Sequence, residues 1–350
     1  MISSIRLQNF RSYKDDSFEF DPGVNIVVGP NASGKTNLLE AVLVLARGSS
    51  YRVRDIELVQ FGKPWARLDG TFQKNTRAVK LEPGDKTFLI DGKPFKRLSL
   101  ERTLPVVFFE PNHLQLMTRG PDQRREYFDD LLERSQPAYR SLVASYKRTL
   151  AQRNALLKHS RTQAAQQLFA WNIRLSQLGS QIAVSRQQLA GEINQILAKT
   201  YSQIAKHKSN VEMKYEAQFP VGNYASRLLS KLEAGAKLDF ERGFTAYGPH
   251  REDFSFYLDG QNVAQTASRG ETRSLLLALK IFELGLIEKA RGQRPIFLLD
   301  DVFSELDGAR RRALVARLKK HQTIITTTDA EAVLEYFSGT HNLMPLNGQS

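Results

Sequence analysis

Residues 29–36 of the sequence, GPNASGKT, have residue types and a spacing that suit phosphate binding. They match the pattern G-x-x-x-x-G-K-[ST] and lie between a strand-like run, 24–29, and a helix-like run, 36–48. In that context glycines let backbone N–H groups surround phosphate oxygens at a helix N-terminus. Lys35 would reach the β- and γ-phosphates, and the Thr36 hydroxyl would bind Mg²⁺. The predicted nucleotide-binding residues are Gly29, Pro30, Asn31, Ala32, Ser33, Gly34, Lys35, Thr36 and Asn37.

Two adjacent carboxylates follow the apolar run PIFLLDD, residues 295–301. Acidic groups at the end of a buried strand are costly unless they have a task. We expect Asp300 to hold Mg²⁺, directly or through water, and Asp301 to polarise the attacking water. Together with Lys35, the pair predicts a catalytic site that hydrolyses ATP with Mg²⁺ as its metal.

A third stretch, SRGE at residues 268–271, reads as a helix start. Ser268 and Glu271 have the spacing of a capping box, which is a sufficient structural explanation for both. It does not explain Gly270, which weakens the first turn of a helix unless something approaches closely. One subunit has no use for a second anion site for the same γ-phosphate. When two subunits face each other, the second anion site of each can bind the γ-phosphate held by the other. We therefore expect Ser268 to act in catalysis at the partner's site, with Gly270 and Glu271 beside the nucleotide.

The composition narrows the class of protein. The 350 residues carry a formal net charge of +13 and no cysteine, which excludes disulfides and thiolate metal sites. The sequence has neither a signal-peptide pattern nor an apolar run long enough to span a membrane. We therefore expect a cytoplasmic protein whose basic surface favours phosphate-rich partners.

Basic residues concentrate in a helical segment. Residues 134–191 contain nine Lys or Arg and no Asp or Glu. If residues 137–161 form one helix, an apolar stripe lies beside a basic one, with Arg153 misplaced on the apolar side. The basic stripe is predicted to bind DNA, although a solvated helix face is the plain alternative. Its members are Arg140, Lys147, Lys158 and Arg161.

The elements around these residues indicate an α/β protein whose core is interrupted in sequence. Strand and helix patterns alternate at both ends, helical composition runs from about 121 to about 216, and Asp-Gly turns predict hairpins at 88–95 and 254–263. The expected organisation is an ATPase lobe made of residues 1–120 and 240–350, with a helical lobe, 121–239, inserted in the chain.

The combination of phosphate loop, acid pair and Ser268 helix resembles the ABC ATPase superfamily and its signature helix. SELD, 304–307, resembles that superfamily's D-loop, and TTTD, 326–329, stands at its switch position, which implies a nucleotide contact for Thr328. The superfamily also has a glutamine that helps to bind the metal. Gln115, in EPNHLQ, is the candidate for it.

The chain resembles most specifically the RecF family of bacterial recombination mediators, within the SMC-like ATPases. LQNFRSY, GPNASGKTNLLEA, GPDQRREYFDDLL and GPHREDFSFYLDG carry the resemblance in order along the chain. It implies an ABC-type P-loop ATPase head, ATP-dependent homodimerisation on double-stranded or gapped DNA, and weak DNA-stimulated ATP hydrolysis. It also implies work with RecO and RecR in DNA replication, repair and the SOS response at the nucleoid, with Arg11 near the nucleotide phosphates or the dimer face. For His250 and Arg251, in GPHR, it implies interface or DNA-coupled roles without assigning one, and a turn histidine held by the backbone is the alternative for His250.

Two other readings remain open. A small-molecule P-loop kinase or hydrolase without a DNA role would have no use for Ser268 or for the acid-free basic segment. An interaction protein with a degenerate nucleotide site would not need an intact Lys35, Thr36 and acid pair.

Overall fold

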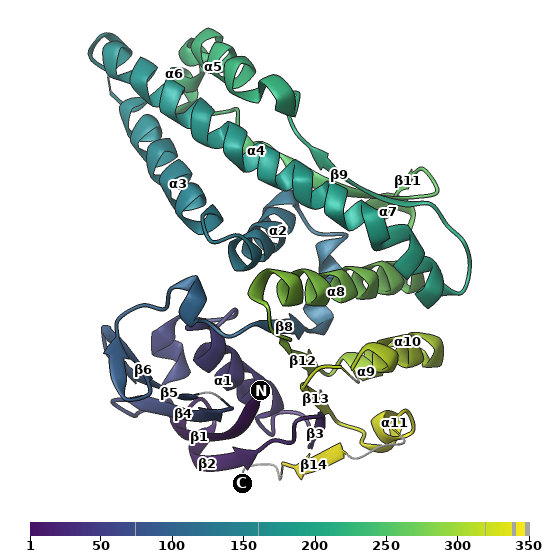
Figure 1. Ribbon diagram of the computed structural model, residues 1–350. Helices are drawn as coiled ribbons and strands as arrows, with labels where there is room; N and C mark the ends of the chain where they lie inside the picture. Colours follow the sequence, from purple (N-terminus) through teal and green to yellow (C-terminus); the bar gives the residue numbers. More distant parts are fainter. Residues whose placement is uncertain (74, 160, 319, 338–340, 347–350) are drawn as a thin grey trace. The chain divides into compact units, whose positions relative to one another are not determined.

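The computed structural model describes residues 1–73, 75–159, 161–318, 320–337 and 341–346, with the side chains of residues 161–166 outside the description (Figure 1). The chain divides into two compact units. Unit 1 combines residues 1–113 with residues 280–350, and unit 2 contains residues 114–279. Both ends of the chain therefore build one unit, and its middle builds the other.

Unit 1 contains a parallel sheet with strand order β14-β3-β13-β12-β8. Every residue of β12 and β13 is buried, as expected for central parallel strands rich in apolar and β-branched residues. Parallel strands end at one edge of their sheet, so the loop after β3 and the acids after β12 lie at the same edge. The strands are β3 (Val24–Val28), β8 (Val106–Phe109), β12 (Ile296–Asp300), β13 (Thr323–Thr327) and β14 (His341–Pro345).

An antiparallel sheet with strand order β2-β1-β4-β5-β6-β7 forms the rest of the unit's β-structure. The predicted hairpin at 88–95 is confirmed: β6 pairs with β7 through Asp91 (φ 49°) and Gly92 (φ 77°). The strands are β1 (Ile2–Phe10), β2 (Tyr13–Glu19), β4 (Ala66–Phe72), β5 (Asn75–Glu82), β6 (Asp85–Ile90) and β7 (Lys93–Phe95).

Helix α1 (Lys35–Arg47) contacts both sheets. It is buried from Leu38 to Ala46, touches β12 and β13 of the parallel sheet, and touches β4 and β5 of the antiparallel one. A helix that is apolar on all sides is stable only when it is buried on all sides. The predicted end at Gly48 is confirmed, with φ 88° and an N–H that donates to the carbonyl of Val44. The phosphate-binding loop therefore leads into the best-packed helix of the unit.

Short helices complete unit 1, and one long helix crosses the division between the units. The long helix is α8 (Arg269–Arg291). The short ones are η1 (Asp55–Leu58), η2 (Leu100–Arg102), α9 (Val302–Glu305), α10 (Gly308–Leu318) and α11 (Glu331–Leu334), with η3 (Pro111–Leu116) at the first boundary.

Unit 2 is mainly helical, with α3 and α4 packed along each other (Figure 1). A three-stranded antiparallel sheet of order β11-β10-β9 packs against α4 through β9. The helices are α2 (Pro121–Ser135), α3 (Tyr139–Leu156), α4 (Arg161–Ala205), α5 (Tyr224–Ala234), α6 (Ala236–Arg242) and α7 (Val263–Thr266), with η4 (Val221–Asn223) and η5 (Pro249–Arg251). The strands are β9 (Val211–Glu216), β10 (Asp253–Leu258) and β11 (Gln261–Asn262).

Three expectations for this region differ from the structure. Residues 240–279 belong to unit 2 instead of the ATPase lobe, because β10 pairs with β9. Residues 211–216 form a strand instead of the end of a helix, since VEMKYE alternates buried and exposed side chains. Residues 137–161 are not one helix: α3 ends at Leu156 and α4 begins at Arg161. The hairpin at 254–263 is confirmed by the pairing of β10 with β11.

Within the described residues, no helix has both the length and the hydrophobicity needed to cross a membrane.

Candidate nucleotide site

The segment between β3 and α1 has the backbone of a phosphate-binding loop. Gly34 (φ 101°) and Ala32 (φ 64°) adopt left-handed conformations. A Cβ on Gly29 would lie 2.7 Å from the backbone carbonyl oxygen of Leu346, as well as 2.6 Å from the Ser33 hydroxyl oxygen, so only glycine fits there. The Tyr13 hydroxyl donates to the Gly34 carbonyl oxygen at 3.0 Å and fixes the start of α1. The helix N-terminus, with its free N–H groups and positive dipole end, thereby faces the loop.

Lys35 folds back onto this loop. Its ammonium donates to the carbonyl oxygens of Gly29 and Pro30, at 2.6 and 2.7 Å. Burial lowers the pKa of Lys35, and the carboxylates of Asp301 and Asp300 act in the opposite direction. The cation is therefore placed at the loop, held by carbonyl contacts that a bound phosphate can replace.

The phosphate-binding loop and the acid pair meet at Thr36 and Asp300. The Thr36 hydroxyl lies 3.0 and 2.9 Å from the two carboxylate oxygens of Asp300. Thr326, which pairs with Asp300 across the β12–β13 ladder, donates its hydroxyl to the same carboxylate at 2.7 Å. The sequence analysis did not predict the contact of Thr326 with Asp300. A hydroxyl group in the last residues of a buried strand could have indicated it.

Asp301 has the surroundings of a proton acceptor. Its backbone is left-handed (φ 49°), and its N–H donates to the backbone carbonyl and the hydroxyl of Thr326, at 3.2 and 3.0 Å. One carboxylate oxygen is buried without a hydrogen-bond partner among the described residues. Burial raises the pKa of Asp301, opposed by the Ser304 hydrogen bond and by Lys35. No described group of the protein uses the lone pairs of this oxygen.

Thr36 and Asp300 fit the coordination that Mg²⁺ prefers. Mg²⁺ is typically bound by one or two protein oxygens, with waters and substrate phosphates as the remaining ligands. Among the described residues, no group of three or more His, Cys, Asp or Glu is arranged to hold a metal by itself. The hydroxyl–carboxylate pair therefore suits a magnesium ion that arrives with a nucleotide.

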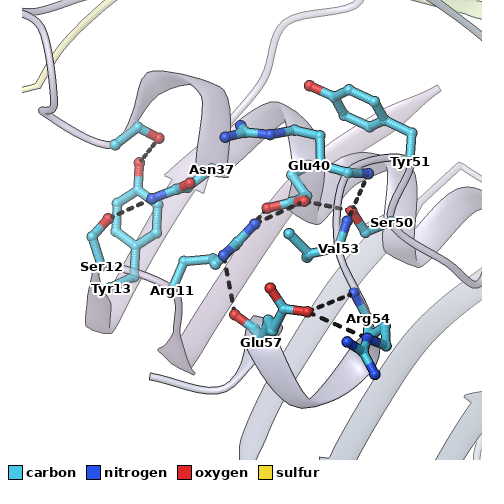
Figure 2. Close-up of polar contacts among 12 residues, drawn as sticks. Arg11, Ser12, Tyr13, Asn37, Glu40, Ser50, Tyr51, Val53, Arg54 and Glu57 are labelled. Atoms are coloured by element: carbon cyan, nitrogen blue, oxygen red, sulfur yellow. Dashed lines mark hydrogen bonds and ion pairs between the residues drawn. The ribbon is translucent and has the colours of Figure 1, made fainter. Parts of the chain in front are cut away.

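Arg11 belongs to a polar cluster centred on Glu40 of α1, which is completely buried (Figure 2). The guanidinium donates to both Glu40 oxygens, at 2.7 and 3.2 Å, and to the backbone carbonyl of Glu57 at 3.1 Å. The Ser50 hydroxyl donates to Glu40 as well, at 2.5 Å. These contacts tie the β1–β2 turn and residues 50–57 to α1, so Arg11 already has partners; its role toward phosphate stays a prediction. Glu40 was missed, although it is a lone acid in the apolar run LLEAVLVLA.

The predicted capping box at the start of α8 is confirmed. The exposed Ser268 donates from its N–H and its hydroxyl to one carboxylate oxygen of Glu271, both at 2.8 Å, and its hydroxyl oxygen accepts from the Glu271 N–H at 3.3 Å. These hydrogen bonds lower the pKa of Glu271. Gly270 lies in the same first turn. The action of Ser268 on a second subunit stays a prediction.

Thr328 and Gln115 differ in their surroundings. Thr328 is exposed directly after β13. Gln115 lies in η3, and its amide oxygen is buried without a hydrogen-bond partner among the described residues. The nucleotide contact of Thr328 and the metal contact of Gln115 stay predictions.

His250 and Arg251, for which the resemblance implied interface or DNA-coupled roles, have contacts within their own unit. The Nε2 of His250 donates to the Thr245 carbonyl at 3.1 Å, so its Nδ1 accepts from the Tyr146 hydroxyl at 2.7 Å. Burial lowers the pKa of His250 to about 4. The guanidinium of Arg251 stacks on Phe244 at 5.0 Å. His250 is therefore a neutral structural histidine.

Three of the four predicted DNA-binding cations are exposed. Arg140 and Lys147 lie on α3, and Lys158 follows its end. Arg161 begins α4, and its side chain lies outside the described residues. Arg153 is buried as its position on the apolar side indicated, and it pairs with Asp239 at 2.8 Å. DNA binding by the exposed cations stays a prediction.

Comparisons with known proteins agree with this geometry. The family described as RecF/RecN/SMC N terminal domain matches residues 1–341. The DNA replication and repair protein RecF of Heliobacterium modesticaldum is 35% identical over 346 residues, covering 95% of this chain and 93% of that protein. The RecF of Acaryochloris marina is also 35% identical over 346 residues, covering 93% and 92%.

Solved structures give the same result for the fold. The recombination mediator protein RecF-ATP of the RecFOR pathway superimposes with a TM-score of 0.85 at 28% identity, over 94% of this chain and 92% of that one. An Smc head bound to the C-winged helix domain of ScpA has a TM-score of 0.54 at 13% identity, over 95% and 91%, which speaks to the fold alone. The predicted ATPase-head fold is thereby confirmed.

Proposed function

This chain belongs to the RecF/RecN/SMC family, and from that premise we propose that it is an ATP-dependent DNA replication and repair protein. It binds ATP with Mg²⁺, dimerises on double-stranded or gapped DNA, and hydrolyses ATP slowly, faster when DNA is bound. It acts with RecO and RecR at gaps and stalled replication forks of the nucleoid, in the cytoplasm.

The observation that carries the nucleotide part is the contact of Thr36 with Asp300, at 3.0 and 2.9 Å. It joins the two ends of the chain into one magnesium-compatible site beside Lys35. Lys35 neutralises the phosphates, Asp300 and Thr36 hold the metal, and Asp301 accepts the proton of the attacking water.

Dimerisation is supported by the exposed Ser268 at the start of α8. Its hydroxyl donates to Glu271 of the same exposed turn, so the group can turn toward a γ-phosphate presented by a second subunit. ATP can hold two subunits together only because it binds more tightly to the dimer than to the monomer. Hydrolysis then releases the pair.

DNA binding is supported by the exposed cations of α3 and the net charge of +13. Lys and Arg side chains gain affinity from the release of counterions around phosphates. The alternative, a small-molecule kinase or hydrolase, gives these cations no function and leaves Ser268 as a helix cap alone.

Light scattering with and without ATP and Mg²⁺ tests the proposal. We expect a monomer without nucleotide and a dimer with it. The proposal is contradicted if the chain stays monomeric with ATP and Mg²⁺ and also after duplex DNA is added. That result would favour the alternative, a small-molecule kinase or hydrolase.

A further inference from the structure

Gly29, the first residue of the phosphate-binding loop, lies between two strands. On one side its N–H donates to the carbonyl oxygen of Thr327 in β13, at 3.3 Å. On the other side lies β14, which pairs with β3 as far as the match of Pro345 with Val28 (Figure 1). The next residue, Leu346, donates its N–H to the Val28 carbonyl oxygen at 2.6 Å. The loop therefore begins between two backbone segments that are each fixed by a hydrogen bond.

The backbone of Leu346 also packs directly against Gly29. A Cβ on Gly29 would lie 2.7 Å from the Leu346 carbonyl oxygen and 3.1 Å from the Leu346 Cβ. Gly29 is buried, and the side chain of Leu346 packs against the apolar core of unit 1. Backbone atoms in a packed interior have little room to move. The end of β14 therefore fixes where the α-carbon of Gly29 lies.

The position of Gly29 matters for phosphate binding. Its carbonyl oxygen accepts the Lys35 ammonium at 2.6 Å, and the N–H groups that follow it must already point toward the phosphates. A loop that contains glycine has many other conformations open to it, because glycine restricts the backbone least. Contacts that exclude these conformations raise the fraction of molecules whose loop is ready to bind, and the apparent affinity rises with that fraction.

The strand β14 is attached at both of its ends. Among the described strands it pairs with β3 alone, as the edge strand of the parallel sheet. At its start, the side-chain amide of Asn342 donates to the Glu19 carbonyl oxygen at 2.9 Å and to the side-chain oxygen of Asn25 at 3.2 Å. These contacts lie at the opposite end of the strand from Leu346. The two attachments can therefore be weakened separately, one beside the phosphate-binding loop and one away from it.

We infer that Leu346 is a positioning residue of the nucleotide site: as the end of β14, it holds Gly29 in the conformation that binds the phosphates. The inference rests on the proposed nucleotide site at Lys35 and Thr36. Leu346 acts through Gly29 and needs no contact with the nucleotide itself. When Leu346 is loosened, more ATP is needed to fill the site. The turnover rate at saturating ATP stays the same, because the bound ligand selects the same loop conformation.

Leu346→Pro tests the inference in the full chain, because proline lacks the N–H that binds the Val28 carbonyl. Titration calorimetry with Mg²⁺ should show ATP binding weakened about tenfold. Inorganic tripolyphosphate should lose the same factor, since the loop binds phosphates. Steady-state hydrolysis should show a raised KM for ATP with an unchanged kcat.

The matched control is Asn342→Ala, which loosens the other end of β14. It should lower the urea midpoint of unfolding, as Leu346→Pro does, without changing the affinity for ATP. The variant Gly29→Ala shows whether Leu346 acts through Gly29. If both changes disturb the same contact, the double variant should bind ATP no more weakly than Gly29→Ala alone.

Hydrogen exchange tests the same coupling in the unaltered chain. If Leu346 favours the binding of ATP, ATP must by reciprocity stabilise the attachment of Leu346. Exchange of the Leu346 N–H should therefore become slower when ATP and Mg²⁺ bind. This measurement decides the question even if Leu346→Pro does not fold.

Several results would overturn the inference. They are wild-type ATP affinity in Leu346→Pro, equal losses of affinity in Leu346→Pro and Asn342→Ala, losses that multiply in the double variant, and unchanged exchange of the Leu346 N–H with ATP. A failure of the proposed nucleotide site looks different. In that case tripolyphosphate does not bind the unaltered chain, and Lys35→Ala has no effect on the affinity for ATP.

Discussion

The hydroxyl of Thr36 contacts both carboxylate oxygens of Asp300, although 264 residues separate them in sequence. The contact exists because β3 and β12 are parallel strands of one sheet that end at the same edge, with β13 between them. It places together the hydroxyl and the carboxylate that we propose as ligands of the metal.

Replacing Asp301 by asparagine tests the role of the second acid. The amide keeps the shape of the side chain but cannot take the proton of water, so we expect the hydrolysis rate to fall by about 10²–10⁴-fold. ATP affinity should stay near the wild-type value. Phosphate release and ATP titration measure the two effects, with the exposed Glu331→Gln as control. Wild-type turnover in Asp301→Asn would remove this carboxylate from the mechanism.

Ser268→Arg tests the composite site. The bulky cation should leave ATP binding by the monomer normal while dimerisation and hydrolysis are lost. Ser268→Ala removes the cap, at a cost of about 1 kcal/mol in unfolding free energy, without adding bulk. Light scattering and phosphate release are the measurements. An unchanged rate of ATP hydrolysis in Ser268→Arg would contradict the proposal that two subunits form the nucleotide site together.

Charge reversal of Arg140, Lys147 and Lys158 to glutamate tests the basic face of unit 2. If each contacts one phosphate, the slope of log affinity against log salt should decrease in size by about 3. Fluorescence anisotropy of labelled duplex DNA at several salt concentrations measures this slope.

The matched control reverses Lys93, Lys96 and Arg97, three exposed cations of unit 1. It has the same change in net charge at a different place. Equal effects of the two triple variants would mean that total charge, and not the α3 face, sets the affinity.

The buried histidine predicts a pH dependence of stability. His250 has a pKa of about 4 in the folded protein and 6.5 as its ordinary value, so the unfolded chain binds more protons between these pH values. Neutral His250 makes its full contribution to the free energy of unfolding above pH 6.5. As the pH falls toward 4, this contribution is lost, and the free energy of unfolding decreases by up to about 3 kcal/mol. Urea unfolding at several pH values should show a flatter profile for His250→Gln. Parallel profiles would contradict the assignment.

A double-mutant cycle measures how much the interaction between Arg11 and Glu40 contributes to the free energy of unfolding. Arg11→Met leaves the completely buried Glu40 with the Ser50 contact, and removal of one partner of a buried pair costs about 3 kcal/mol or more. Arg11→Met with Glu40→Leu should recover most of that loss. Urea unfolding measures the cycle. A stable Arg11→Met protein that binds ATP poorly would instead make Arg11 a phosphate contact.

The sequence was informative where the chemistry is local. Residues that are neighbours in sequence determine five of the predicted features, so a short pattern was enough to recognise each. They are the phosphate loop, the acid pair, both Asp-Gly hairpins and the Ser268 cap. Glu40 and Thr326 were missed because their partners lie on other strands and turns. The strand at 211–216 was missed because a long helical composition precedes it, and its partner β10 lies some 40 residues later. The position of Arg153 was recognisable as unusual, but nothing nearby in sequence pointed to Asp239.

Among the described residues, β3 pairs with β13 and β14, which the ribosome makes after the other strands of unit 1. At about 5–20 residues per second, Val28 waits on the order of 15–60 s before residue 323 is synthesised. During that time an apolar strand has both edges open, a state prone to unwanted pairing between chains. The nucleotide site is consequently assembled only after β12 and β13 have been made, and a chain cut short before β12 carries the complete phosphate loop without the strand that bears Asp300.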